Sequence, residues 1–245
     1  MNAHFAKAQI NGIDLYYRTL GTGLPLLLLH GGLGNADYWD NQLLVFAERY
    51  KVIAIDSRGH GRSTFTEEPI SYALMATDVI ALLDKLGIER VAVVGWSDGG
   101  MIGLELALHH PERLHKLIAC GANYNPSGLR ADVNENEKFN RYIAQAAADY
   151  QQVAADPLRW NAFLENIGQM WATAPDYTPA QLATIATPTL ILDGEEEELI
   201  EINHVKEMAG LIPTAKLLLM AGVGHFAPWE QPQAFNQIVL DFLLE

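Results

Sequence analysis

Residues 91–110 read VAVVGWSDGGMIGLELALHH, and this stretch decides the fold. Its first four residues are all apolar, as in a strand buried on both faces, and a helical pattern begins directly after Gly99. A serine flanked by glycines at such a sharp turn holds its hydroxyl above the sheet, because larger side chains at Gly95 and Gly99 would collide with the turn. The pattern predicts a nucleophilic serine at Ser97. A plain helix N-cap serine is the less favoured interpretation.

Apolar runs of strand length recur along the chain and alternate with helical patterns, of which residues 71–87 and 232–245 are the clearest. This alternation predicts an α/β fold with a mostly parallel sheet of about eight strands and helices on both faces. Asn11-Gly12 separates two strand patterns near the start and predicts an antiparallel hairpin at the sheet edge. The further buried runs are residues 24–30, 51–56, 114–121 and 187–194.

Residues 122–180 break this alternation, because they contain helical patterns and no convincing strand. We therefore expect an α/β core in residues 1–121 and 181–245, interrupted by a small helical cap in residues 122–180. Aromatic side chains in and near this insertion are candidates for a substrate pocket under the cap, although most aromatics of such a segment serve its own packing. The candidates are Trp96, Tyr124, Phe139, Trp160 and Trp171.

Composition excludes several classes of function. The 245 residues carry a formal net charge of −14, which argues against nucleic acid and against anionic membranes as partners. No apolar run reaches the ~20 residues of a membrane helix, and no secretory signal pattern is visible at the N-terminus. Cys120 is the single cysteine, so an internal disulfide is impossible. We expect a cytoplasmic protein whose partner is a small molecule, with no metal signature, P-loop or dinucleotide motif, and hence no cofactor.

A serine nucleophile needs a base, and His225 is the best of eight histidines. It follows an apolar strand pattern, and Gly222 and Gly224 free its loop at the carboxyl edge of the predicted sheet, where open α/β sheets place their chemistry. It also follows Ser97 in the chain, as the Ser…acid…His order requires. His30 is interpreted as a hydrogen-bonding residue that orders its loop.

Four motifs stand together in one order: HGGLG (residues 30–34), DSRGHGRS (56–63), GWSDGG (95–100) and GVGHF (222–226). With them the whole chain resembles the α/β-hydrolase superfamily, and is most similar to small carboxylesterases, valacyclovir hydrolase-like enzymes and enol-lactonase-like enzymes. The resemblance implies Ser97 as nucleophile and His225 as base. It also implies an oxyanion hole formed by the backbone N–H groups of Gly32 and Asp98. A serine at position 97 excludes the aspartate-nucleophile branches, haloalkane dehalogenases and epoxide hydrolases.

The acid is expected in ILDGEEEELI, residues 191–200. The family usually carries G-x-x-D after this strand, and the fourth position counted from Gly194 is Glu197. Glu196 and Glu198 stay open as alternatives, with Asp193 less favoured because it belongs to the strand end. Two other acids receive structural roles. Asp98 is interpreted as favourable charge at a helix N-terminus, and Asp56 is expected to order its loop together with Arg58.

These residues predict a two-step, metal-free acyl transfer to water on a small ester, thioester or lactone. Ser97 would form the acyl-enzyme, and His225 would then activate water. Two alternatives stay open: C–C bond hydrolysis or cofactor-free perhydrolysis at the same site, and a catalytically silent hydrolase fold that only binds ligands.

Overall fold

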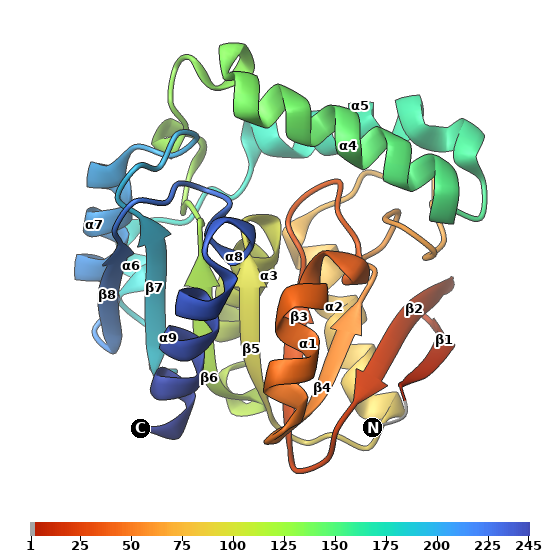
Figure 1. The fold of residues 1–245 in the computed structure, drawn as a ribbon, viewed down its shortest axis with the longest axis horizontal. Coiled ribbons are helices and arrows are strands. Elements are labelled where there is room, and N and C mark those ends of the chain that lie inside the picture. The colour runs from red at the N-terminus through yellow and green to blue at the C-terminus, as the bar shows by residue number, and fades with distance from the viewer. Residues whose placement is uncertain (1–2) are drawn as a thin grey trace.

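In the computed structural model, which describes residues 3–245, eight strands form one sheet in the order β1-β2-β4-β3-β5-β6-β7-β8 (Figure 1). β2 runs antiparallel to both β1 and β4, and every other neighbouring pair is parallel. The predicted mostly parallel sheet is confirmed. The strands are β1 (His4–Ile10), β2 (Ile13–Leu20), β3 (Leu24–Leu29), β4 (Tyr50–Ile55), β5 (Val91–Trp96), β6 (Leu114–Cys120), β7 (Thr189–Gly194) and β8 (Ala215–Met220).

The antiparallel edge is the hairpin that the sequence predicts. Ile10 pairs with Ile13 across the two-residue turn. Asn11 and Gly12 have φ of 42° and 77°, and positive φ at both central residues is what a type I′ turn requires. Asparagine and glycine adopt this conformation at little cost, which explains why the chain reverses here.

Helices cover both faces of the sheet. α1 and α9 lie in front of it in Figure 1, and α2 and α3 lie behind, so the central strands are buried on both sides. The α-helices are α1 (Asp40–Ala47), α2 (Tyr72–Lys85), α3 (Asp98–His109), α4 (Glu137–Val153), α5 (Trp160–Thr173), α6 (Pro179–Leu182), α7 (Ile202–Leu211), α8 (Ala227–Glu230) and α9 (Pro232–Leu244). Short 3-10 turns are η1 (Ala36–Trp39), η2 (Pro111–Arg113), η3 (Pro126–Gly128), η4 (Val133–Glu135) and η5 (Pro157–Arg159).

Residues 122–180 add no strand to the sheet, and their one strand-like contact is an isolated bridge between Leu129 and Ile200. α4 and α5, which we call the α4–α5 pair, cross above the carboxyl ends of the parallel strands (Figure 1). Each buries an apolar face, since Tyr142, Ala146 and Tyr150 of α4 are buried while its other face carries charged residues. The pair therefore roofs the edge at which the parallel strands end.

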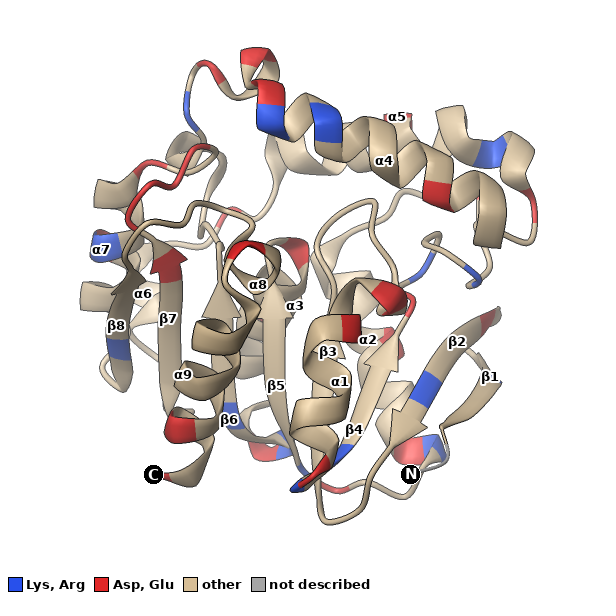
Figure 2. Cartoon of the chain, in the orientation of Figure 1, with Lys and Arg blue, Asp and Glu red and all other residues tan. Residues whose placement is uncertain are grey.

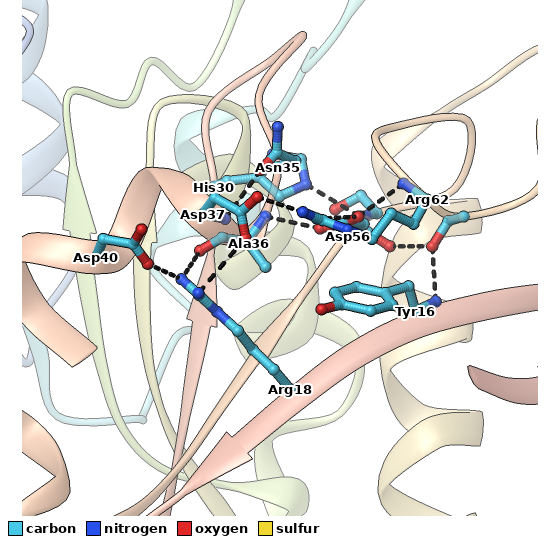
Figure 3. Close-up of polar contacts among 11 residues, drawn as sticks. Tyr16, Arg18, His30, Asn35, Ala36, Asp37, Asp40, Asp56 and Arg62 are labelled. Carbon is cyan, nitrogen blue, oxygen red and sulfur yellow. Dashed lines mark hydrogen bonds and ion pairs between the residues drawn. The ribbon is translucent and has the colours of Figure 1, made fainter. Parts of the chain in front are cut away.

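A polar network fixes the loop that follows β3 (Figure 3). Asp56, at the end of β4, accepts hydrogen bonds from the backbone N–H groups of Ala36 and Arg62, each at 2.7 Å. The guanidinium groups of Arg62 and Arg18 both pair with Asp37 in the same loop. The buried carboxylate of Asp56 thus ties the loop after β3 to the loop after β4.

The expected partnership of Asp56 with Arg58 is wrong. Arg58 turns away and forms a two-pronged ion pair with Asp78 of α2, with Nε and Nη2 at 2.8 and 2.7 Å from the two carboxylate oxygens. Asn11 of the hairpin turn also donates to Asp78, at 3.0 Å. Arg58 is hence bound to the helical layer behind the sheet, and Arg62 takes the place beside Asp56.

Across residues 3–245, none of the helices combines the length and the apolar character needed to cross a membrane.

Candidate active site

Ser97 lies at the turn between β5 and α3 with φ of 54° and ψ of −120°, a conformation that side-chain-bearing residues rarely adopt. The glycines on either side make the turn possible. A Cβ at Gly95 would stand 2.1 Å from the carbonyl oxygen of Gly99, and one at Gly99 would stand 2.0 Å from that of Leu29. The predicted collision with the turn is confirmed for Gly95, whereas Gly99 is required because the neighbouring strand β3 lies against it.

The structure brings Ser97, His225 and Glu197 into one hydrogen-bonded chain. His225 Nε2 lies 3.0 Å from Ser97 Oγ, and Nδ1 lies 3.0 Å from Glu197 Oε2. Because Nδ1–H donates to the carboxylate, Nε2 is free to accept the serine proton. A serine, a base and an orienting acid in this geometry can carry out nucleophilic catalysis.

The four glutamates after β7, visible as the acidic loop above that strand in Figure 2, have separate environments. Glu195 and Glu196 are exposed. Glu197 is buried and contacts the imidazole, whereas Glu198 accepts the backbone N–H of His225 at 2.9 Å. Of the three candidates for the acid, Glu197 is the one whose carboxylate meets the histidine ring.

The second oxygen of Glu197, Oε1, accepts the backbone N–H groups of Leu199 and Ile200 at 2.6 and 3.1 Å. Burial by itself would raise the pKa of Glu197, but His225 and these hydrogen bonds outweigh it and lower the pKa to about 2. For His225, burial works against the charged ring, and the Glu197 carboxylate reverses that effect, so the pKa of His225 is raised above its usual value. The acid thus holds its charge and makes the histidine a stronger base.

Asp193, at the end of β7, is a second carboxyl close to this acid. It is buried, one oxygen accepts the N–H of Gly194 at 2.8 Å, and the other oxygen has no hydrogen-bond donor among the described residues. Burial, then the charge of Glu197, raise the pKa of Asp193 well above its usual range. Both effects favour the neutral form of Asp193.

The loop after β3 approaches the serine from the opposite side. A Cβ at Gly31 would stand 3.3 Å from Cβ of Ser97, and one at Gly32 would stand 2.5 Å from the carboxylate of Asp98 and 2.5 Å from the ring of Trp171. Position 32 therefore has no room for a side chain. Gly32 and Asp98 lie beside Ser97. The binding of an oxyanion by their backbone N–H groups stays a prediction.

Asp98 does more than stand at a helix N-terminus. Its Oδ1 accepts hydrogen bonds from the hydroxyl of Tyr72 at 3.0 Å and from the indole N–H of Trp171 at 2.9 Å. Burial raises the pKa of Asp98 to about 6, although both hydrogen bonds act in the other direction. Since Trp171 lies on α5, this carboxylate connects the start of α3 to the α4–α5 pair.

His30 orders the loop and is not a second base. Its Nε2 accepts the backbone N–H of Ser57 at 3.0 Å, so its Nδ1–H donates to the carbonyl of Gly31 at 2.8 Å. Full burial lowers the pKa of His30 to about 4 and keeps the ring neutral. The interpretation from sequence is confirmed.

A cavity of about 270 Å³ opens directly above Ser97 and His225. Asp98 is its one carboxylate, and among the described residues no Lys or Arg lines it. The site therefore suits a small, mainly apolar group beside the serine. The apolar wall consists chiefly of Met101, Leu129, Phe139, Trp171, Leu199 and Ile200.

Of the five aromatics expected to bind substrate, Phe139 and Trp171 line this cavity. Trp96 borders only a narrow recess of about 20 Å³, and its indole N–H donates to the carbonyl of His225 at 2.8 Å. Tyr124 and Trp160 do not reach the site. Tyr124 stacks on His204 with ring centres 4.1 Å apart, and Trp160 packs within the α4–α5 pair.

Comparison with known proteins agrees with this fold. The family model described as alpha/beta hydrolase fold matches residues 25–164, more than half of the chain. A putative carbamate hydrolase, RutD, of Azorhizobium caulinodans is 32% identical over 255 residues, covering 94% of each chain. The chain belongs to the α/β hydrolase fold family.

Two further relatives of this α/β hydrolase are informative. The 2-hydroxy-6-oxo-6-phenylhexa-2,4-dienoate hydrolase of Comamonas testosteroni is 29% identical, covering 98% of this chain and 95% of its own. A solved structure of Est816, an N-acyl homoserine lactone degrading enzyme, is 28% identical with a TM-score of 0.77, covering 96% of this chain and 99% of its own. The relatives thus act on different substrates.

Sequence reasoning missed several residues around the site of this α/β hydrolase. Tyr72 lines the cavity and binds Asp98, yet it reads as an ordinary residue at the start of an amphipathic helix. Glu230 contacts the histidine loop and Lys138 pairs with Glu230 and Glu198, yet both residues read as surface charges. The partners of Tyr72 and Lys138 are more than 25 residues away in the chain, so no local pattern reveals them. Among residues 3–245, His, Cys, Asp and Glu form no group suited to a metal ion.

Proposed function

We propose that this protein is a serine hydrolase that cleaves small, uncharged carboxylic esters, thioesters or lactones through an acyl-enzyme on Ser97. The observation that carries the proposal is the hydrogen-bonded chain from Ser97 Oγ through His225 to Glu197, with both links at 3.0 Å. Base and acid are buried, the nucleophile is partly exposed to the cavity, and the three stand in the order that acyl transfer needs.

In the first step, His225 Nε2 takes the hydroxyl proton as Ser97 Oγ bonds to the substrate carbonyl carbon. The carbonyl oxygen becomes negatively charged, and the N–H groups of Gly32 and Asp98 stabilise it. The tetrahedral intermediate then collapses, the bond to the leaving oxygen or sulfur breaks, and His225 gives its proton to that atom. An acyl-serine and a neutral histidine are left.

In the second step, water replaces the alcohol. His225 takes a proton from the water as its oxygen attacks the acyl carbon, and the same N–H groups stabilise the second oxyanion. The bond to Ser97 Oγ then breaks, His225 returns the proton to that oxygen, and the carboxylic acid leaves. Glu197 keeps its charge throughout and stabilises the imidazolium formed in each step.

The cavity favours uncharged acyl groups. Its volume of about 270 Å³ suits a short chain or small ring, and its walls offer the Asp98 carboxylate and no Lys or Arg among the described residues. An anionic substrate would enter a buried site without a counter-ion, which is costly. The dienoate named for the Comamonas relative is such an anion, so this observation favours ester hydrolysis over C–C hydrolysis of acidic substrates.

The test is hydrolysis of p-nitrophenyl butyrate by the wild type, Ser97→Ala and Ser127→Ala. Ser127 is an exposed serine away from the cavity and serves as the matched control. We expect turnover and fluorophosphonate labelling of the wild type and of Ser127→Ala, and the loss of both in Ser97→Ala. A wild type that neither turns over nor labels would instead be a binding protein, and full activity in Ser97→Ala would disprove the nucleophile.

A substrate panel then defines the class. It includes acetate to octanoate esters, thioesters, lactones, carbamate esters and a p-nitrophenyl ester of matched length with a terminal carboxylate. We expect the carboxylate-bearing ester to have a kcat/KM at least about tenfold below its neutral counterpart. Equal rates would contradict the substrate class while leaving the acyl-enzyme mechanism in place. Turnover of a dienoate, or of hydrogen peroxide with a carboxylic acid, would favour the alternatives.

A further inference from the structure

The loop that carries His225 is held by two carboxylates from outside the Ser–His–Glu chain. Glu198 Oε2 accepts the backbone N–H of His225 at 2.9 Å, and Glu230 Oε2 accepts that of Gly224 at 2.7 Å. The contact is tight, since a Cβ at Gly224 would stand 1.8 Å from Glu198 Oε2. These two carboxylates therefore fix the backbone from which the catalytic imidazole projects.

One cation holds both carboxylates. Lys138 Nζ lies 2.6 Å from Oε1 of Glu198 and 2.7 Å from Oε1 of Glu230. Each carboxylate thus uses one oxygen for the histidine loop and the other for Lys138. Figure 2 shows basic residues at the N-terminal end of α4, close to the acidic loop that follows β7.

This arrangement differs from an ordinary surface ion pair, which contributes little to stability. Oε1 of Glu198 is buried, and no hydrogen bond reaches it, so Lys138 provides its charge partner. Without Lys138, a buried carboxylate oxygen would lack a partner and two carboxylates would face each other across the loop. The carboxylates would be expected to turn toward water and release the N–H groups of Gly224 and His225.

Lys138 also stands at a point where the α4–α5 pair meets the reaction site. The next residue, Phe139, lines the cavity, and one turn further the hydroxyl of Tyr142 donates to the carbonyl of Gly32. The first turns of α4 therefore contact the two carboxylates that hold the histidine loop, the cavity, and the loop of the predicted oxyanion hole. A shift of this helix changes all three together.

We propose that Lys138 is a positioning residue. It acts through Glu198 and Glu230 to hold His225 in line with Ser97, so that the position of α4 on the core affects catalysis. This inference rests on the proposed hydrolase function. Displacing a catalytic group by about 1 Å can lower a rate by about a hundredfold, so a modest loosening of the loop is enough to be measured. Because Lys138 does not line the cavity, substrate affinity is expected to change little.

The experiment compares Lys138→Met and Lys138→Arg with Arg141→Met, a matched control on the same helix. Arg141 is exposed and pairs only weakly, at 3.7 Å, with the exposed Glu137. We expect Lys138→Met to lower kcat for p-nitrophenyl butyrate between about tenfold and a hundredfold, with KM changed less than about threefold. Lys138→Arg should restore most of kcat, because arginine can bridge two carboxylates. Arg141→Met should match the wild type.

Hydrogen exchange of residues 221–226 supplies a readout that needs no turnover. We expect these amides to exchange faster in Lys138→Met than in the wild type and in Arg141→Met. Equal kcat and equal exchange in the two methionine variants would overturn the proposal. A wild type without esterase activity would refute the proposed function alone, and the exchange comparison would still decide the role of Lys138.

Discussion

Replacing Glu197 by glutamine tests the centre of the site with a change of one atom. Oε1 accepts two backbone N–H groups, from Leu199 and Ile200, so the amide must keep its oxygen there and turn its NH₂ toward His225. Two donors cannot face each other, and His225 must move its proton from Nδ1 to Nε2. The imidazole then presents an N–H to Ser97 where it previously presented an acceptor.

The predicted loss follows from this wrong tautomer. In a serine protease, the equivalent acid-to-amide change lowers kcat by about 10⁴-fold, and each factor of ten corresponds to about 1.4 kcal/mol of activation free energy. We therefore expect Glu197→Gln to lower kcat by about 10⁴-fold, or about 5.5 kcal/mol, with little change in KM. The assay is steady-state hydrolysis of p-nitrophenyl butyrate at pH 8.

Glu196→Gln is the matched control, because it makes the same change on the adjacent, exposed carboxylate. It should retain the activity of the wild type. A Glu197→Gln enzyme within about tenfold of Glu196→Gln would refute the assignment of the acid and the tautomer argument together.

Three other measurements probe the surroundings of the acid. Activity is lost when His225 is protonated, so kcat/KM should fall as the pH is lowered through the pKa of His225. Because this pKa is raised, the midpoint of the fall in kcat/KM should lie above pH 6.5, and a midpoint below 6.5 would contradict this. Burial and the charge of Glu197 favour a neutral Asp193, so the uncharged and similarly shaped Asp193→Asn should change kcat less than about threefold in steady-state kinetics, and a loss of about a hundredfold would contradict this. Arg58→Met leaves Asp78 as a buried charge without its ion-pair partner, and we expect urea denaturation to show a loss of about 3–5 kcal/mol in the free energy of unfolding.

The sequence was sufficient to predict candidate catalytic residues that directly follow a strand. Ser97 and His225 each follow an apolar run flanked by glycines, and the carboxyl ends of parallel strands lie at one edge of the sheet. Glu197 was predicted from the family's usual G-x-x-D pattern, counted from Gly194, which ends β7. The hairpin could also be predicted, because Asn11 and Gly12 determine the conformation of the turn locally.

Pairings between distant segments could not be predicted. Arg58 has Asp56 two residues away, yet its partner is Asp78 on α2, because side chains choose partners by the tertiary packing of helices on the sheet. The rotation of α4 and α5 about their axes decides that Phe139 and Trp171 face the cavity while Trp160 does not. A helical pattern gives the period of such a face and leaves its direction undetermined.

The α4–α5 pair makes three polar contacts around the reaction site: Lys138 pairs with the two carboxylates that hold the histidine loop, Tyr142 donates to the loop after β3, and Trp171 donates to Asp98. This matters for protein engineering, because the substrate range of such an enzyme could be changed by exchanging the inserted helices between relatives. A graft chosen only for the shape of its pocket would arrive without these three contacts. We expect transplanted helices to restore turnover only when their partners on the recipient's loops are transferred with them.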